Sequence, residues 1–259
     1  MIYHGGDIIP GKVTINLILY GDWSVFKVGN DAQEIITNFV ENLGTSSYWR
    51  TATGYYDTDD FVKANIVLGG VFYDRFSTGF GTSLDYAALP AIVQNAIQTG
   101  FGGVADYNAL YVVITDPDVT NSYGFCSEFC AYHTFYSDGD QAVKYTFVGN
   151  PATQCYYSCA PQDDPSQPTA NGNPGIDALT SSLAHEIAEA ITDPKPFTTW
   201  YDQNRLEIAD KCAYNYILDP LPTVANGGQY NVALGNRRYL LQGLWVNDLG
   251  GYCDILPTY

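Results

Sequence analysis

The sequence predicts an α/β (α+β) fold: a twisted mixed sheet with an antiparallel edge strand, covered by helices and stabilised by disulfides. Apolar runs of strand length alternate with segments whose apolar residues follow helical spacing, and this order favours parallel strands joined by helices. Two further short strands flank a polar turn and predict a hairpin at one edge of the sheet. Six cysteines, an even number, predict three disulfide bonds.

Most of the predicted sheet comes from the first half of the chain. Continuous apolar runs predict buried strands at residues 13–20, 64–73 and 110–115. Helical spacing of apolar residues predicts a helix at 32–43, with Asn30 and Asp31 as N-cap candidates. A second helix is predicted at 89–99, because Pro90 suits a first turn and Gly100 suits a helix end.

The second half supplies the hairpin, a helix and an irregular tail. The hairpin joins residues 131–136 to 142–148, and a loop rich in Pro, Gly and Asn follows at 151–175. Thr180, Ser181 and Ser182 are N-cap candidates for a helix that ends at Asp193-Pro194. The tail is loop-rich, with one strand predicted at 238–246. Without a linker that separates domains, we expect a single domain over 1–259, in which 1–194 carry the sheet and this helix and 195–259 complete the site.

Composition excludes some partners. The net charge is −17, from 28 acidic and 11 basic residues, so nucleic acid and anionic membranes are poor partners. No apolar stretch is long enough to cross a membrane. The chain opens with MIYHGGDIIPG, without a basic start or an apolar run, so we expect that Met1 replaces a removed signal peptide.

The cysteines indicate an oxidising, extracellular location. We expect Cys126 and Cys130 to pair with the next two cysteines, which leaves Cys212 with Cys253. The alternative is a zinc site made by two Cys-x₃-Cys pairs, the second of them at 155 and 159. A spacing of three residues is slightly wide for such a site, so disulfides are favoured.

The chemically most informative stretch is His185-Glu186-Ile187-Ala188-Glu189. Residues four apart share one face of a helix, so His185 and Glu189 can bind the same ion. Zinc peptidases use this layout in their His-Glu-x-x-His helix, where the inner Glu is the general base. Here the second ligand position carries Glu, so the motif is a variant. It predicts a zincin-like sheet with the metal-site helix packed below it. The alternative is an amphipathic helix whose charged side faces water.

A second acidic segment supports a metal site. Glu207 follows Glu189 by 18 positions, and Asp210 comes one turn later. This spacing resembles that of zinc peptidases in which a Glu from a following helix is the third ligand and an acidic residue hydrogen-bonds the ligand His. Glu207 is then the third ligand and Asp210 its outer partner, or the two roles are exchanged.

The expected reaction assigns roles to three further side chains. With a divalent ion bound, Glu186 is the general base that takes the proton of the attacking water. His133, on the predicted hairpin, and Tyr201 are candidate hydrogen-bond donors to the oxyanion, although either side chain can instead serve packing. Asp193 is expected to cap the turn before Pro194 rather than bind the ion. Because one His and two carboxylates cancel a charge of +2, Ca²⁺ or Mn²⁺ is an alternative to Zn²⁺, and a structural ion is a serious rival.

Nearly the whole chain also resembles a known family, the phosphate-induced protein 1 (EXORDIUM) family of extracellular proteins, best known from plants. The resemblance rests on YHGG at 3–6, INLILYGDWS at 15–24, VLGG at 67–70, LYVVIT at 110–115, FCSEFCAYHTF at 125–135, FVGNPATQC at 147–155, AHEIAEAITDP at 184–194, EIADKC at 207–212 and RRYLLQ at 237–242. It implies secretion to the cell wall or apoplast and a role connected with growth, without a defined reaction. The chain departs from the plant pattern in its short tail and acidic surface.

Three functions follow from these observations. The first is a secreted zinc-dependent metallo-endopeptidase that acts on an extended peptide or protein substrate. The second is a non-catalytic extracellular cell-wall protein, related to growth, with a structural metal ion. The third is a protein that binds or cleaves wall carbohydrate, for which aromatic residues and carboxylates would be needed. In each case we expect a monomer.

Overall fold

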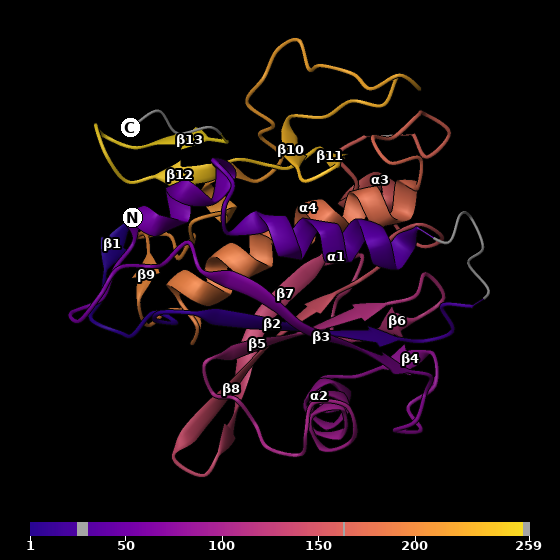
Figure 1. The fold of residues 1–259 in the computed structure, drawn as a ribbon, viewed down its shortest axis with the longest axis vertical. Helices are drawn as coiled ribbons and strands as arrows, with labels where there is room; N and C mark the ends of the chain where they lie inside the picture. Colours follow the sequence, from indigo (N-terminus) through magenta and orange to yellow (C-terminus); the bar gives the residue numbers. More distant parts are fainter. Residues whose placement is uncertain (25–30, 163, 256–259) are drawn as a thin grey trace.

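A five-stranded mixed sheet forms the centre of the molecule. The structure is a computed structural model that describes residues 1–24, 31–162 and 164–255. The strand order is β3-β2-β5-β8-β7, in which the first four strands are parallel and β7 runs antiparallel at one edge (Figure 1). Their bounds are Ile66–Asp74, Val13–Tyr20, Ala109–Thr115, Gln141–Val148 and Ala131–Asp138. The predicted mixed sheet with an antiparallel edge strand is therefore confirmed.

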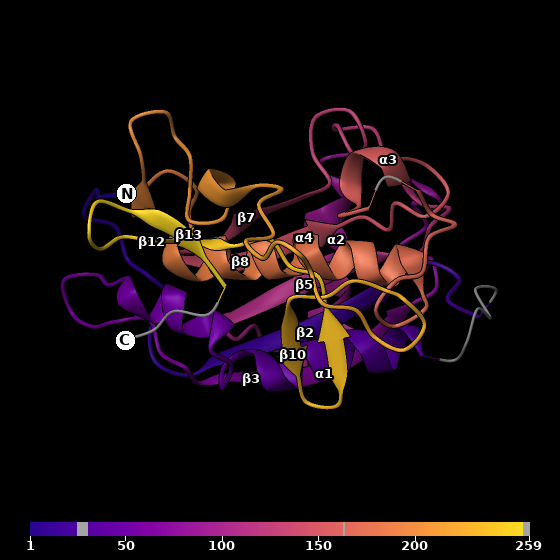
Figure 2. The same cartoon turned by 90° about the horizontal axis from the view of Figure 1, so that it is seen from above.

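Helices cover both faces of this sheet. α1 (Ala32–Leu43) and α4 (Pro174–Thr192) lie on one face, and α2 (Ala88–Thr99) lies on the other (Figures 1 and 2). The alternation of side chains along β2 explains the two cores: Leu17 packs in the cluster with α1 and α4, whereas Ile18 packs in the cluster with α2. Because β2 is covered on both sides, it is apolar throughout, as its sequence predicted.

Helix α4 begins earlier than predicted. Its N-cap is Asn173, whose side chain accepts a hydrogen bond from the backbone N–H of Ile176, and Pro174 occupies the first turn. The expected cap residue Thr180 lies inside the helix and donates its hydroxyl to the Asp177 carbonyl. The loop predicted at 151–175 is therefore shorter, and it also contains the short helix α3 (Tyr156–Cys159). At α1, Asp31 makes no side-chain cap, and Asn30 lies outside the described residues.

The predicted strand at 238–246 is wrong. The segment is divided between two hairpins: β11 (Arg237–Tyr239) pairs with β10 (Val232–Leu234), and β12 (Leu244–Val246) pairs with β13 (Tyr252–Asp254). Between them, the side chain of buried Asn231 bonds both the N–H and the C=O of Leu241. These bonds satisfy backbone groups that a continuous strand would direct to a neighbour.

The remaining elements are short and lie outside the central sheet. β1 (Ile2–Tyr3) pairs with β9 (Trp200–Tyr201), so the first residues lie against the segment after α4. The other short elements are η1 (Tyr48–Gly54), β4 (Ser83–Leu84), β6 (Thr120–Asn121) and η2 (Asp210–Cys212). Among the helices of the described residues, none is long and apolar enough to cross a membrane.

The disulfide pairing is confirmed. All six cysteines are bonded, which excludes the alternative zinc site made of thiolates. The pairs are Cys126–Cys155, Cys130–Cys159 and Cys212–Cys253. The first two bridges tie the segment before β7 to α3, and the third ties η2 to β13.

Candidate metal centre

The two α4 side chains that the sequence selected do meet on one face of the helix. The Nε2 atom of His185 lies 3.0 Å from Oε2 of Glu189. Asp210, at the start of η2, brings its Oδ1 to 3.3 Å from the same nitrogen. Ligand atoms of these three residues all lie within 4.8 Å of one another, which is close enough to hold one ion. Of the two acidic residues considered as third ligand, the structure places Asp210 in this group.

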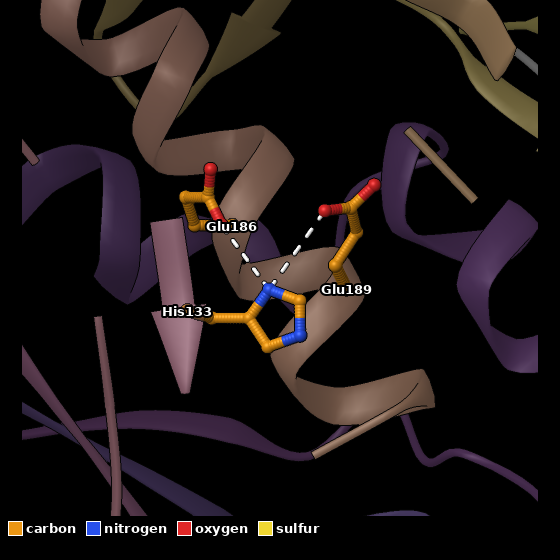
Figure 3. A group of neighbouring side chains, drawn as sticks. All are labelled: His133, Glu186 and Glu189. Carbon is orange, nitrogen blue, oxygen red and sulfur yellow. Dashed lines mark hydrogen bonds and ion pairs between the residues drawn. The ribbon is translucent and has the colours of Figure 1, made fainter. Parts of the chain in front are cut away.

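His133 reaches the same helix from the edge strand β7. Figure 3 shows its Nδ1 atom between two carboxylates of α4, 3.2 Å from Oε2 of Glu186 and 3.8 Å from Oε2 of Glu189. The other nitrogen, Nε2, lies 3.2 Å from the backbone carbonyl of Asp193 and 3.5 Å from Oε1 of Glu207. His133, Glu186 and Glu189 form a second group whose ligand atoms lie within 4.8 Å of one another.

The carboxylates of Glu186, Glu189 and Glu207 are buried, that of Asp210 is half-buried, and several of them are held by backbone groups. Oε1 of Glu189 accepts hydrogen bonds from the backbone N–H groups of Ala209 and Asp210, at 3.2 and 3.0 Å. Oδ2 of Asp210 in turn accepts the backbone N–H of Glu207. Oε1 of Glu207 has no hydrogen-bond partner, although this residue is only 4% exposed. An unsatisfied buried carboxylate oxygen is costly. The two groups themselves consist of imidazole nitrogens and carboxylate oxygens, and this donor set fits a divalent cation.

Burial and charge shift the protonation of both histidines. Burial alone lowers the pKa of His133, but the facing carboxylates of Glu207, Glu186 and Glu189 outweigh it and raise the pKa to about 10. At His185 burial also lowers the pKa, but Glu189 and Asp210 outweigh this effect and raise the pKa well above its ordinary value.

The pKa values of the acidic side chains in the centre are shifted in opposite directions. Burial raises the pKa of Glu207 to about 10, and it also raises the pKa of Glu189. Burial acts the same way on Asp210, but the hydrogen bond and charge of His185 outweigh it and hold this pKa below its ordinary value. Without a metal, the centre therefore holds protons at positions that a cation would occupy.

A single cleft of about 650 Å³ contains the whole centre. It is lined by six of the seven residues predicted for the site: His133, His185, Glu186, Glu189, Glu207 and Asp210. Aromatic side chains form other parts of its wall, among them Tyr86, Tyr123, Phe129, Phe197 and Tyr214. Strand β7 contributes residues 131–134, so the edge of the sheet borders the cleft.

Tyr201 is the predicted site residue that lies apart from the others. It is not among the residues that line the cleft; its ring stacks on His4 at 3.6 Å and meets the edge of Phe197. Asp193 acts as a turn cap, as predicted, but the turn lies after Pro194 and not before it, because the carboxylate accepts the backbone N–H groups of residues 197–199. The sequence did not reveal Gln242, whose side-chain amide contacts Nδ1 of His185. RRYLLQ contains this residue, but no spacing rule connects it to α4.

Comparison with known proteins identifies the family. Protein EXORDIUM-like 3 of Arabidopsis thaliana is 29% identical over 97% of this chain and 81% of that protein. Protein EXORDIUM-like 1 of the same plant is 30% identical over 94% and 86%, and Protein PHOSPHATE-INDUCED 1 of Nicotiana tabacum is 28% identical over 94% and 84%. The family description that matches residues 1–255 is the phosphate-induced protein 1 conserved region. The chain therefore belongs to the phosphate-induced protein 1 family.

Proposed function

We propose that this protein is a secreted, metal-dependent peptidase whose ion is held by His185, Glu189 and Asp210. The observation that carries the proposal is the convergence of these three side chains beside an open sheet edge in one cleft. A bound Zn²⁺ or Mn²⁺ supplies Lewis acidity to a substrate carbonyl and to water. Three disulfides favour an extracellular location.

The chain's own residues supply the remaining steps. Among the strands of the described residues, β7 pairs with β8 alone, so its outer edge can align an extended peptide by backbone hydrogen bonds. Glu186 is adjacent to the ligands and takes the proton of the attacking water. His133 donates to Glu186 through Nδ1 and to the Asp193 carbonyl through Nε2, so it orients the base in this state. The oxyanion role predicted for His133 would require one of these bonds to break. Tyr201, outside the cleft lining, takes no part in this proposal.

A non-catalytic protein with a structural ion is the second candidate. Glu189 and Asp210 neutralise a divalent ion, and such a shell makes bound water less acidic than a shell with two histidines does. This composition suits Ca²⁺ as well as Zn²⁺. A carbohydrate ligand is favoured by a different observation, the exposed rings of Tyr86, Tyr123 and Tyr214 around the cleft. Binding to cell-wall polysaccharide without peptide cleavage would support that role.

The metal is tested first by elemental analysis of the full chain after incubation with zinc. We expect bound zinc in the wild type and one ion fewer in His185→Ala. His4→Ala is the matched control, because His4 is exposed and outside the cleft lining. The absence of bound metal in the wild type would refute the centre, and calcium in place of zinc would favour the structural ion.

Peptide cleavage is tested with a mixture of unstructured peptides. We expect Glu186→Gln to abolish cleavage and to retain the ion at His185, because the substitution removes the base and keeps the ligands. The exposed Glu41 on α1 provides the control, Glu41→Gln, which should cleave like the wild type. Equal cleavage by Glu186→Gln and wild type would contradict the base, and a metal-bound wild type without any cleavage would contradict the peptidase.

A further inference from the structure

One carboxylate oxygen is shared by the two histidines of the centre. Oε2 of Glu189 lies 3.0 Å from Nε2 of His185 and 3.8 Å from Nδ1 of His133. The other oxygen of Glu189 is occupied by the backbone N–H groups of Ala209 and Asp210. These two bonds fix the carboxylate so that Oε2 faces both rings. Glu189 consequently belongs to both groups of potential ligands.

Each histidine also has a carboxylate of its own. Nδ1 of His133 lies 3.2 Å from Oε2 of Glu186, and Nε2 of His185 lies 3.3 Å from Oδ1 of Asp210. Figure 3 shows how His133 and Glu186 face each other. The centre thus repeats one pattern twice around Glu189: one imidazole nitrogen and one carboxylate on either side. A single ion at His185 would leave the His133 half of the pattern without a cation.

The far nitrogen of His133 is held in the way that metal-binding histidines require. Such histidines usually donate the N–H that does not face the metal to a carbonyl or carboxylate. His133 meets the Asp193 carbonyl through Nε2 at 3.2 Å. His185 meets the side-chain amide of Gln242 through Nδ1. In this structure the amide nitrogen of Gln242 faces Nδ1. Rotation of the amide group by a half turn would bring its oxygen to the ring, so that Nδ1 donates its hydrogen and Nε2 is free to bind an ion.

The charge of the cluster fits two cations rather than one. Glu186, Glu189, Glu207 and Asp210 carry up to four negative charges, and in the described part of the chain none of them forms an ion pair with Lys or Arg. One divalent ion leaves an excess of two negative charges beside neutral histidines, whereas two divalent ions balance all four. The Oε1 atom of Glu207, in a residue that is 4% exposed, has no hydrogen-bond partner and lies 3.5 Å from Nε2 of His133, so the carboxylate of Glu207 adds to the negative charge beside the two groups without belonging to either.

We propose that this cluster binds two divalent cations bridged by Glu189, one with His185 and Asp210 and the other with His133 and Glu186. The proposed ligands are three carboxylates and two histidines, and bridged two-metal sites in helical proteins likewise combine carboxylates with histidines. The proposal rests on the metal centre of the proposed function and changes one role. With the second ion bound, Glu186 would be a ligand and no longer the general base. The two ions together would lower the pKa of bound water, which in the one-ion centre requires the help of a base.

Metal stoichiometry tests the two halves separately. The full chain, freed of metal with a chelator, is titrated with Zn²⁺ and with Mn²⁺, and bound metal is measured after removal of the excess. We expect two ions per chain in the wild type and in the control Glu41→Gln, one in Glu186→Gln, one in Asp210→Asn and none in Glu189→Gln. These substitutions keep the size of each side chain, so thermal unfolding of the metal-free variants shows whether each one folds.

The bridge is tested first on the wild type, so the deciding result does not depend on the folding of a variant. Two Mn²⁺ ions that share Oε2 of Glu189 should give the electron paramagnetic resonance spectrum of an exchange-coupled pair. Glu186→Gln, if folded, should give the spectrum of an isolated ion. A single ion in the wild type, or two ions with uncoupled spectra, overturns the proposal.

The outcomes also separate this inference from the peptidase. One bound ion together with peptide cleavage would overturn the bridged pair and leave the proposed function standing. Two coupled ions without cleavage of any peptide would support the pair and overturn the peptidase. No bound ion would overturn both.

Discussion

Replacing Asp193 by Asn should destabilise the protein, because this carboxylate organises the turn after α4. Asp193 is fully buried. Its Oδ1 accepts the N–H groups of Thr198 and Thr199, at 3.1 and 2.8 Å, and its Oδ2 accepts the N–H of Phe197 at 2.8 Å. An Asn side chain can keep the two bonds of Oδ1, but its NH₂ group then faces the N–H of Phe197, and two donors repel.

The expected loss of unfolding free energy follows from the hydrogen bond between the N–H of Phe197 and Oδ2 of Asp193, which the substitution removes. A hydrogen bond to a charged acceptor contributes about 1.5–3 kcal/mol, and an unsatisfied buried donor costs about 1–3 kcal/mol. Since Phe197 is partly exposed, water relieves some of the second term, and we expect Asp193→Asn to lose about 3 kcal/mol of unfolding free energy. For a chain of this size that corresponds to a decrease in Tm of roughly 6 °C.

Urea denaturation and thermal melting of the metal-free protein provide the assay. The control is Asp140→Asn, because Asp140 is exposed in the hairpin turn between β7 and β8, and it should change the unfolding free energy by less than about 0.5 kcal/mol. If Asp193→Asn loses no more than the control, the three backbone bonds do not stabilise the turn as argued. If it loses bound metal and keeps its stability, Asp193 is a ligand.

Two further predictions concern pH and the disulfides. The metal-free chain should lose stability as pH rises from about 5 to about 10. In the fold the pKa of His133 and the pKa of Glu207 are both raised to about 10. Binding of these protons therefore stabilises the fold fully below the pKa values of the unfolded chain, and this contribution is lost as pH rises to about 10. Melting at several pH values in chelator tests this; Glu207→Gln should flatten the slope, and a Tm that rises with pH would contradict it. Replacing Cys212 and Cys253 by Ser opens a loop with a sequence separation of 41 and should cost about 4 kcal/mol in urea denaturation; a loss below about 1 kcal/mol would refute the loop-closure argument.

The sequence predicts an element well where its pattern is complete within that element. The apolar run of β2 and the helical spacing of α1 gave bounds that match the structure, since both patterns describe burial against the sheet. The strand expected at 238–246 shows the opposite case. Its residues are apolar and suit a strand, but Asn231 bonds the backbone of Leu241 from another segment. No local pattern encodes that contact.

The predicted start of α4 at residues 180–182 is wrong for a different reason. Asn173 and Pro174 are good helix-starting residues, yet they stand in a segment whose Gly, Pro and Asn content is typical of a loop. The polar residues Thr180 and Ser181 then offered a later cap. In the structure both are buried in the helix, and Ser181 accepts the backbone N–H of Gln242 at 3.4 Å.

Within the candidate site, helical spacing was sufficient to bring His185 and Glu189 together. It was not sufficient to choose between Glu207 and Asp210, because the turn that separates these two carboxylates is set by a bond from the N–H of Glu207 to Asp210. The contact of His133 with α4 depends on its position in the sheet, where it lies opposite Thr146 of β8. Pairings of this kind arise from tertiary structure, so the two-sided arrangement around Glu189 becomes visible only in the fold.

All three disulfides lie beside the cleft, and none of them joins two strands of the central sheet. Cys126, Cys130 and Cys159 line the cleft wall, and Cys212 follows Asp210 by two positions. The sheet and its helices are held by apolar packing and backbone bonds that thiol chemistry does not touch. A reducing environment would therefore loosen the site before the core. We therefore expect the geometry of the centre to depend on the redox state of its surroundings, and to be kept only where the three disulfides stay oxidised.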